Sequence, residues 1–246
     1  MNIKTIQFIF QLFVFLSVGM TAFAQGTLWY NGDPGQAGFA NLGSYSSANN
    51  PTFTGVVYDN FIVSAASGGW QVDSVFGNFY TGGGTDIAGL TNAEWSIRSN
   101  VSTGNGGTLV AGGTSAVSLA SNGSGNSLNP GYKISIAGLD LVLSPGTYWL
   151  AVVPLTSSTT DNFGSYAGLA ATTGVNAIGL PAGNDGNAFY NSSSGINYQS
   201  SSQSPGAIND FSLGITGNFI GVPEPSTWAM LTMNAVAMLI LRRRVR

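Results

Sequence analysis

Between residues 25 and 221, alternation of apolar and polar side chains with a period of two recurs in several stretches, and this pattern indicates the fold class of the chain. β-Branched and aromatic residues occupy many of the apolar positions, and no stretch keeps a helical i, i+3, i+4 apolar spacing. Residues 93–98 show the pattern most clearly, with alanine, tryptophan and isoleucine on one face and three polar side chains on the other. The segment therefore predicts β-strands and no helices.

Further strands are expected wherever the same alternation recurs between turn signals. The patterns predict strands at 55–63, 70–80, 108–110, 132–136 and 211–215. Glycine-rich turn signals occur at 67–69, 82–84 and 105–107. Many short strands with no helical spacers favour an all-β fold, an antiparallel β-sandwich of jelly-roll type.

Two longer segments carry more specific expectations. Residues 139–153 predict a hairpin that turns at Ser144-Pro145-Gly146, and its second strand, 147–153, is apolar on both faces and so is expected to be central. Residues 156–205 are rich in Ser, Thr, Gly and Asn and predict a long loop. The aromatic residues expected to hold this loop on the sheet are Tyr166, Phe189, Tyr190 and Tyr198.

The N-terminus has the layout of a secretory signal peptide, predicted as residues 1–24. One early cation precedes an apolar run at 6–18, and Ala22 and Ala24 form a small-x-small site before Gln25, where cleavage is expected. The apolar run would make a helix of about 20 Å, which is shorter than the roughly 30 Å hydrocarbon core. The alternative is an uncleaved N-terminal anchor.

The C-terminus, residues 222–246, has three parts in a fixed order. Pro223, Glu224 and Pro225 come first, and residues 226–241 would form a short transmembrane helix of about 24 Å. The basic residues that follow, and that the positive-inside rule would keep in the cytoplasm as a membrane stop, are Arg242, Arg243, Arg244 and Arg246. This orientation places residues 25–221 outside the membrane as an ectodomain.

These three parts resemble the sorting signal of the PEP-CTERM family, in which Pro223, Glu224 and Pro225 match the recognition motif. The resemblance implies a membrane-embedded processing enzyme of the exosortase type as a partner. It also implies a Gram-negative bacterium that makes exopolysaccharide, an inner-membrane intermediate, and a final place at the cell surface or in the extracellular matrix. The alternative is a plain tail anchor with a chance Pro-Glu-Pro linker.

The residue types present exclude several kinds of chemistry. The chain has no cysteine and no histidine, so thiolate nucleophiles, imidazole bases and the usual zinc ligands are absent. Residues 25–221 carry two basic against nine acidic residues, and this negative charge would repel the phosphates of nucleic acid. No cofactor and no metal site are assigned from the sequence.

Carboxylates are what remains for catalysis, since two of them suffice for glycoside hydrolysis. The available ones are Asp59, Asp73, Asp86, Glu94, Asp140 and Asp161. Each has a structural alternative, and Glu94 could pair with Arg98 on the same strand face. Calcium could be held by Asp59 or Asp140, although no Asp-x-Asp-x-Asp-Gly loop occurs.

Aromatic rings give a candidate surface for carbohydrate, because sugars stack on tryptophan and tyrosine. Trp29 and Tyr30, near the start of the mature chain, are expected to be exposed, whereas Trp95 and Trp149 are expected in the core. The leading hypothesis is a structural or adhesive protein of the cell surface or matrix that is associated with exopolysaccharide and is not an enzyme. The alternative is a secreted carbohydrate-active hydrolase with paired carboxylates.

Overall fold

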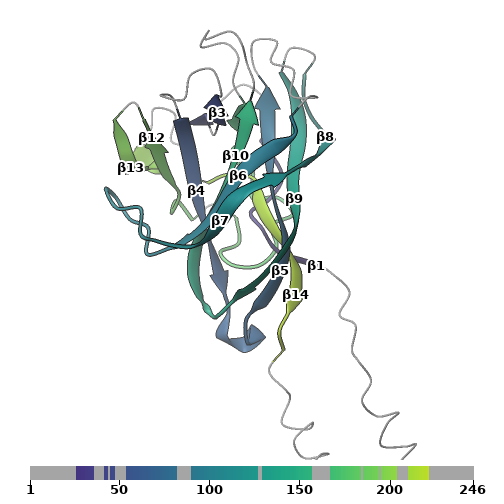
Figure 1. Cartoon of the computed structure of the whole chain (residues 1–246), viewed down its shortest axis with the longest axis vertical. Helices are drawn as coiled ribbons and strands as arrows, with labels where there is room; N and C mark the ends of the chain where they lie inside the picture. The colour runs from purple at the N-terminus through teal and green to yellow at the C-terminus, as the bar shows by residue number, and fades with distance from the viewer. Residues whose placement is uncertain are drawn as a thin grey trace, which may run out of the picture.

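The computed structural model describes most of the predicted ectodomain as an all-β fold (Figure 1). The residues described are 26–35, 42–43, 45–47, 54–81, 90–126, 129–156, 167–183, 185–193, 195–203 and 210–221. The predicted signal peptide and the whole sorting tail, with its predicted helix, lie outside these residues. In the described part no helix is long and apolar enough to cross a membrane.

The first sheet is built around β5, which has hydrogen-bonded neighbours on both sides. Its strands are β1 (Gly26–Tyr30), β2 (Leu42–Gly43), β5 (Trp70–Thr81), β8 (Ser118–Asn126), β9 (Asn129–Leu143), β11 (Ala167–Leu169) and β14 (Leu213–Phe219). All pairings in this sheet are antiparallel. The first and last strands, β1 and β14, are neighbours, with Gly26 opposite Gly217.

The second sheet is built around β4 and β10. Its strands are β3 (Tyr45–Ser47), β4 (Thr54–Val63), β6 (Asn92–Ser99), β7 (Thr108–Ala116), β10 (Gly146–Thr156), β12 (Phe189–Ser192) and β13 (Ile196–Ser200). The pairings are antiparallel except for the short contact between β3 and β10. β10 lies between β4 and β6, which confirms the expectation of a central strand.

Two tight connections lead from one sheet to the other at the same end of the molecule. After β4 the chain passes through η1 (Ala65–Ser67) into β5, and after β9 it passes through residues 144–145 into β10. The two connections are adjacent, because Val63 is opposite Gly146 and Trp70 is opposite Leu143. The hairpin expected at 139–153 is therefore wrong: its two strands belong to different sheets.

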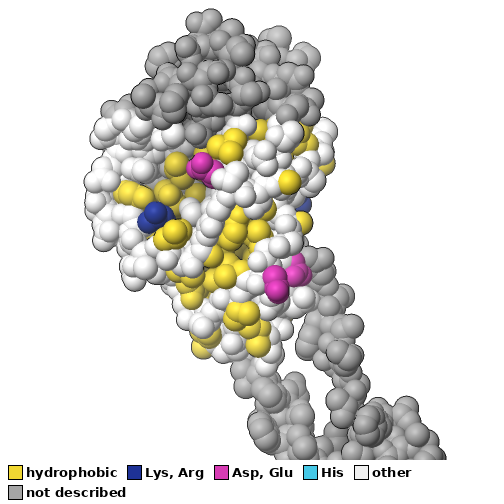
Figure 2. All heavy atoms as spheres, viewed as in Figure 1, with side chains coloured by type: hydrophobic (Ala, Val, Ile, Leu, Met, Phe, Trp, Pro, Cys, Tyr) yellow, Lys and Arg dark blue, Asp and Glu magenta, His cyan; other side chains and the backbone are white. Residues whose placement is uncertain are grey.

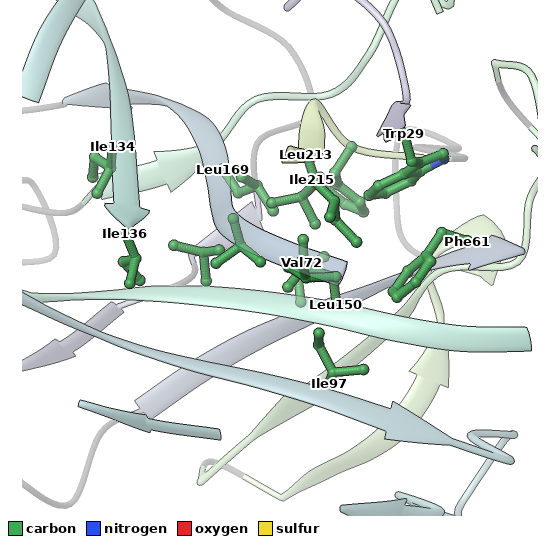
Figure 3. Packing of buried hydrophobic residues seen from close by; sticks show 14 of the residues in the cluster. Trp29, Phe61, Val72, Ile97, Ile134, Ile136, Leu150, Leu169, Leu213 and Ile215 are labelled. Atoms are coloured by element: carbon green, nitrogen blue, oxygen red, sulfur yellow. The ribbon is translucent and has the colours of Figure 1, made fainter. Parts of the chain in front are cut away.

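One apolar core holds the two sheets together (Figure 3). Phe61 of β4 is fully buried, and its ring centroid lies 5.5 Å from that of Trp29 and 5.6 Å from that of Trp70. Ile97 and Leu150 face this core from the second sheet, as the alternation in their strands predicts. Burial of such side chains contributes about 1.5–3 kcal/mol each.

A smaller apolar cluster lies on the other face of the second sheet. Its buried members are Tyr58, Val101, Trp149, Ala151 and Phe189. This cluster explains why β10 is apolar on both faces: Leu150 and Val152 point to the main core and their neighbours point to the smaller cluster. The burial of Trp149 confirms its expected core position, and Trp95 is partly buried against the main core.

Residues 156–205 are not one long loop, since they contain β11, β12 and β13. Their aromatic side chains do pack on the sheet as expected. Phe189 lies 6.4 Å from Trp149, and Tyr198 lies 5.5 Å from Tyr58, each measured between ring centroids. Tyr190 packs against the main core, and Tyr166 lies outside the described residues.

Candidate functional site

The most unusual group of side chains in the described structure is a linked set of acids and amides at one side of the core. It consists of the buried residues Asn31, Asp59, Asn60 and Asp210 and of Asp185, which is exposed, and we call it the Asp–Asn cluster. Asn31 follows β1 of the first sheet, whereas Asp59 and Asn60 lie within β4 of the second. The cluster therefore joins the two sheets.

Strand periodicity explains why Asp59 is inside. It is two residues from both Val57 and Phe61, so the alternation of β4 points its carboxylate to the same face, which is the main core. Asp59 is 0% exposed and Asp210 is 1% exposed. Carboxylates this deeply buried are rare in proteins unless they are paired.

Three donors hold the Asp59 carboxylate. Its Oδ2 accepts from the Asn31 side-chain amide at 2.9 Å and from the Phe211 backbone N–H at 2.6 Å. Its Oδ1 accepts from the Asn60 backbone N–H at 2.8 Å. Because Phe211 lies two residues before β14 and Asn31 directly after β1, these bonds attach the first sheet to β4.

Asp210 is held by the segment that closes this side of the molecule. Its Oδ2 accepts from the backbone N–H groups of Asp185 and Gly186, the latter at 3.2 Å. The Asp185 carboxylate in turn accepts from the Asn60 side-chain amide at 3.0 Å. The same segment reaches both sheets upstream, where Ile178 pairs with Tyr30 and the Leu180 carbonyl accepts from the Ile62 N–H at 2.7 Å.

Both buried carboxyls favour the protonated state more than an ordinary aspartate does. Burial, and next the charge of Asp210, raises the pKa of Asp59 well above its usual range. Burial also raises the pKa of Asp210 to about 6, and the charge of Asp185 acts in the same direction. Hydrogen bonds from backbone N–H groups oppose both shifts without cancelling them.

The carboxylates proposed for hydrolysis do not form one site in the described structure. Asp59 is enclosed in the core, Glu94 is exposed on β6, and Asp73 and Asp140 lie where β5 and β9 shift register. Asp140 is exposed and accepts a 2.6 Å hydrogen bond from the Gln71 side chain. Asp86 and Asp161 lie outside the described residues.

The expected pairing of Glu94 with Arg98 is wrong. Residues four apart on a strand are separated by about 13 Å, which is too far for an ion pair between neighbours on one face. Arg98 instead donates to the Gly106 carbonyl at 2.8 Å, and its guanidinium carbon lies 5.8 Å from the centre of the Tyr58 ring.

The expectation that Trp29 is exposed is also wrong. Its side chain is 0% exposed and packs on Phe61, because this position of β1 faces the main core. Tyr30 is partly buried, and its hydroxyl donates to Asp33 Oδ1 at 3.1 Å. The Trp29 ring therefore presents no free face of the kind that sugar stacking needs.

The predicted processing residues cannot be placed in the structure. The signal-cleavage residues Ala22, Ala24 and Gln25 lie outside the described residues, as do the sorting-motif residues 223–225 and the arginines after residue 241. Charged side chains are few on the face shown in Figure 2, where apolar groups lie along the middle among backbone and uncharged side chains.

The described features define a two-sheet, largely antiparallel β protein in which two aspartates, Asp59 and Asp210, are buried. Comparison with known proteins finds no family model that matches the chain and no curated protein sequence that matches it significantly.

Proposed function

We propose that this chain is an exported protein of the bacterial cell surface or extracellular matrix, sorted by an exosortase-type enzyme and structural or adhesive in its work. In this proposal its β region, a jelly-roll-like sandwich, is held at the inner membrane through the C-terminal tail, and that tail is then removed. Exopolysaccharide is the proposed matrix partner, and no catalytic role is assigned.

One structural observation supports this arrangement above the others. β1 and β14 are adjacent, and Gly26 lies opposite Gly217 near the end of the described chain. The described chain therefore begins and ends on neighbouring strands, which are next in sequence to the predicted leader and to the predicted sorting tail. A domain tied to a membrane through this end would direct its opposite end away from the bilayer (Figure 1).

The chemistry of the tail supports the same proposal. Two prolines around Glu224 keep that stretch extended and non-helical, which is the form that a protease binds most easily. The arginines beyond the apolar segment would stop its transfer through the membrane. With these features, the tail would hold the chain in the membrane until the processing enzyme cuts it.

The test is to replace Pro223, Glu224 and Pro225 with alanine in the producing bacterium. We expect the native chain to lose its arginine end and leave the inner membrane, and the variant to keep both. A matched variant with Ser226→Ala and Thr227→Ala, directly after the motif, should be processed like the native chain. Equal mass and equal location for the native and triple-alanine chains would reject sorting.

A second experiment addresses the role of the β region. The exported protein is incubated with exopolysaccharide of the producing strain, and both retention and released sugar are measured. Retention without release supports an adhesive role. Release of sugar that is lost on substitution of Asp73 or Asp140 would support a hydrolase instead.

A further inference from the structure

β7 is an outer strand of the second sheet, and its edge is open. It pairs with β6 on one side, and among the described residues no backbone hydrogen bond joins its other side. Most of its residues are exposed, among them Leu109 at 55% and Val110 at 42%. The backbone N–H and C=O groups along such an edge are a template for pairing with another strand.

Other outer strands of the described structure are covered or interrupted. On β1, Tyr30 exchanges two backbone hydrogen bonds with Ile178, of 2.9 and 2.8 Å. On β13, the Tyr198 carbonyl accepts from the Gly104 N–H at 3.1 Å. β8, the outer strand of the first sheet, is irregular at residues 121–125, and an irregularity of this kind hinders pairing between edges.

The sequence of β7 lacks the residues that usually keep sheet edges apart. From residue 108 to residue 126, through β7 and β8, there is no charged residue and no proline. After a bulge at Val110, the register of β7 with β6 is regular from Ala111 to Ala116. The side chains of this regular stretch are small, so none of them obstructs the approach of a second strand.

A second copy of the chain is the partner that this edge fits. Residues 25–221 have two basic and nine acidic residues, so two copies repel one another and approach most easily where charge is absent. If two β7 strands pair, the β6 strands that carry Glu94 lie three strand spacings apart, or about 14 Å. This distance exceeds the Debye length of about 8 Å at physiological salt, so the repulsion between them is largely screened.

We propose that two copies of this chain associate by antiparallel pairing of their β7 strands about a two-fold axis, which joins their second sheets into one. A pairing centred on Gly113 sets Ala111 opposite the partner's Ser115 and Gly112 opposite the partner's Thr114. These small side chains fit opposite one another without overlap. The inference goes beyond the proposed function, because the pairing needs neither the sorting tail nor a polysaccharide.

The test is sedimentation equilibrium of the purified full chain in a mild detergent, which covers its apolar ends. One pair of strands makes a small interface, so we expect a reversible monomer–dimer equilibrium between about 10 µM and about 1 mM. Gly113→Lys, where a Cβ meets open space, should weaken dimerisation about fivefold, because it sets two like charges opposite each other. Val175→Lys, at a 57% exposed position bonded to the segment after β1, should not weaken it.

These two variants change the net charge equally, so they separate strand pairing from long-range repulsion. Equal strengthening of dimerisation by both would assign the association to net charge and overturn the proposal. A native chain that sediments as a monomer at every concentration would also overturn it.

A cross-link tests the place of the contact independently, since the chain has no cysteine of its own. Gly113→Cys should form a disulfide-linked dimer on mild oxidation, because opposite residues of an antiparallel pair have Cα atoms about 4.5–5.5 Å apart, within the range that a disulfide spans. Val175→Cys should stay monomeric. Equal cross-linking of the two cysteine variants, or a native dimer that Gly113→Cys does not cross-link and Gly113→Lys does not weaken, would place the contact elsewhere and overturn the proposal.

Discussion

Acidification should stabilise this protein, because of the buried pair Asp59 and Asp210. The pKa of Asp210 is raised in the folded state to about 6 from an ordinary 3.8. The folded chain therefore binds a proton more tightly than the unfolded chain does. The stabilising contribution of the protonated carboxyl is fully present below the unfolded value and is lost as the pH rises through the folded one.

The size of the effect follows from these two pKa values. For Asp210 alone, the free energy of unfolding should be higher at pH 5 than at pH 7.5 by about 1.4 kcal/mol, and at pH 4 by about 2.4 kcal/mol. Asp59 should add to the effect in the same direction, since burial raises its pKa as well. Acidification more often removes stability, because many carboxylates are held in ion pairs.

The assay is urea denaturation of the full chain, followed by tryptophan fluorescence at several pH values between 4 and 7.5. Asp210→Asn should reduce the pH dependence to the part that Asp59 contributes, because an amide in this place cannot titrate. Asp140→Asn should keep the native slope. A native chain whose free energy of unfolding stays constant or falls from pH 7.5 to pH 5 would refute the reasoning.

Two further predictions test the packing of the core and the close approach of β14 to β5. Phe61→Ala should lower the free energy of unfolding by about 3–5 kcal/mol, because it removes a fully buried ring from between the sheets; Phe219→Ala, at a half-exposed ring on β14, should cost less than about 1 kcal/mol. Gly214→Ala should cost about 1–3 kcal/mol, because a Cβ there would overlap the Phe76 ring. Gly113→Ala, where a Cβ meets open space, should change stability by at most about 0.5 kcal/mol. Urea denaturation measures all four, and equal costs within either pair would contradict the packing described.

Alternation along the chain predicted most strands, because each strand has one face on the core. The expected strands at 55–63, 70–80 and 93–98 agree with β4, β5 and β6 to within a residue or two at each end. The pattern could not show which sheet a strand joins. A two-residue connection at Ser144 and Pro145 suits a hairpin and a crossing between sheets equally well, and contacts distant in sequence decide between them.

The Asp–Asn cluster could be predicted only in part from the sequence. The apolar spacing of Val57, Phe61 and Val63 carries a signal for a buried Asp59, because the same period places it among them. Nothing near Asp210 carries such a signal, since its backbone donors at 185 and 186 are about 25 residues away. Trp29 was misjudged for a related reason: its burial depends on β14, which pairs with β1 from the far end of the chain.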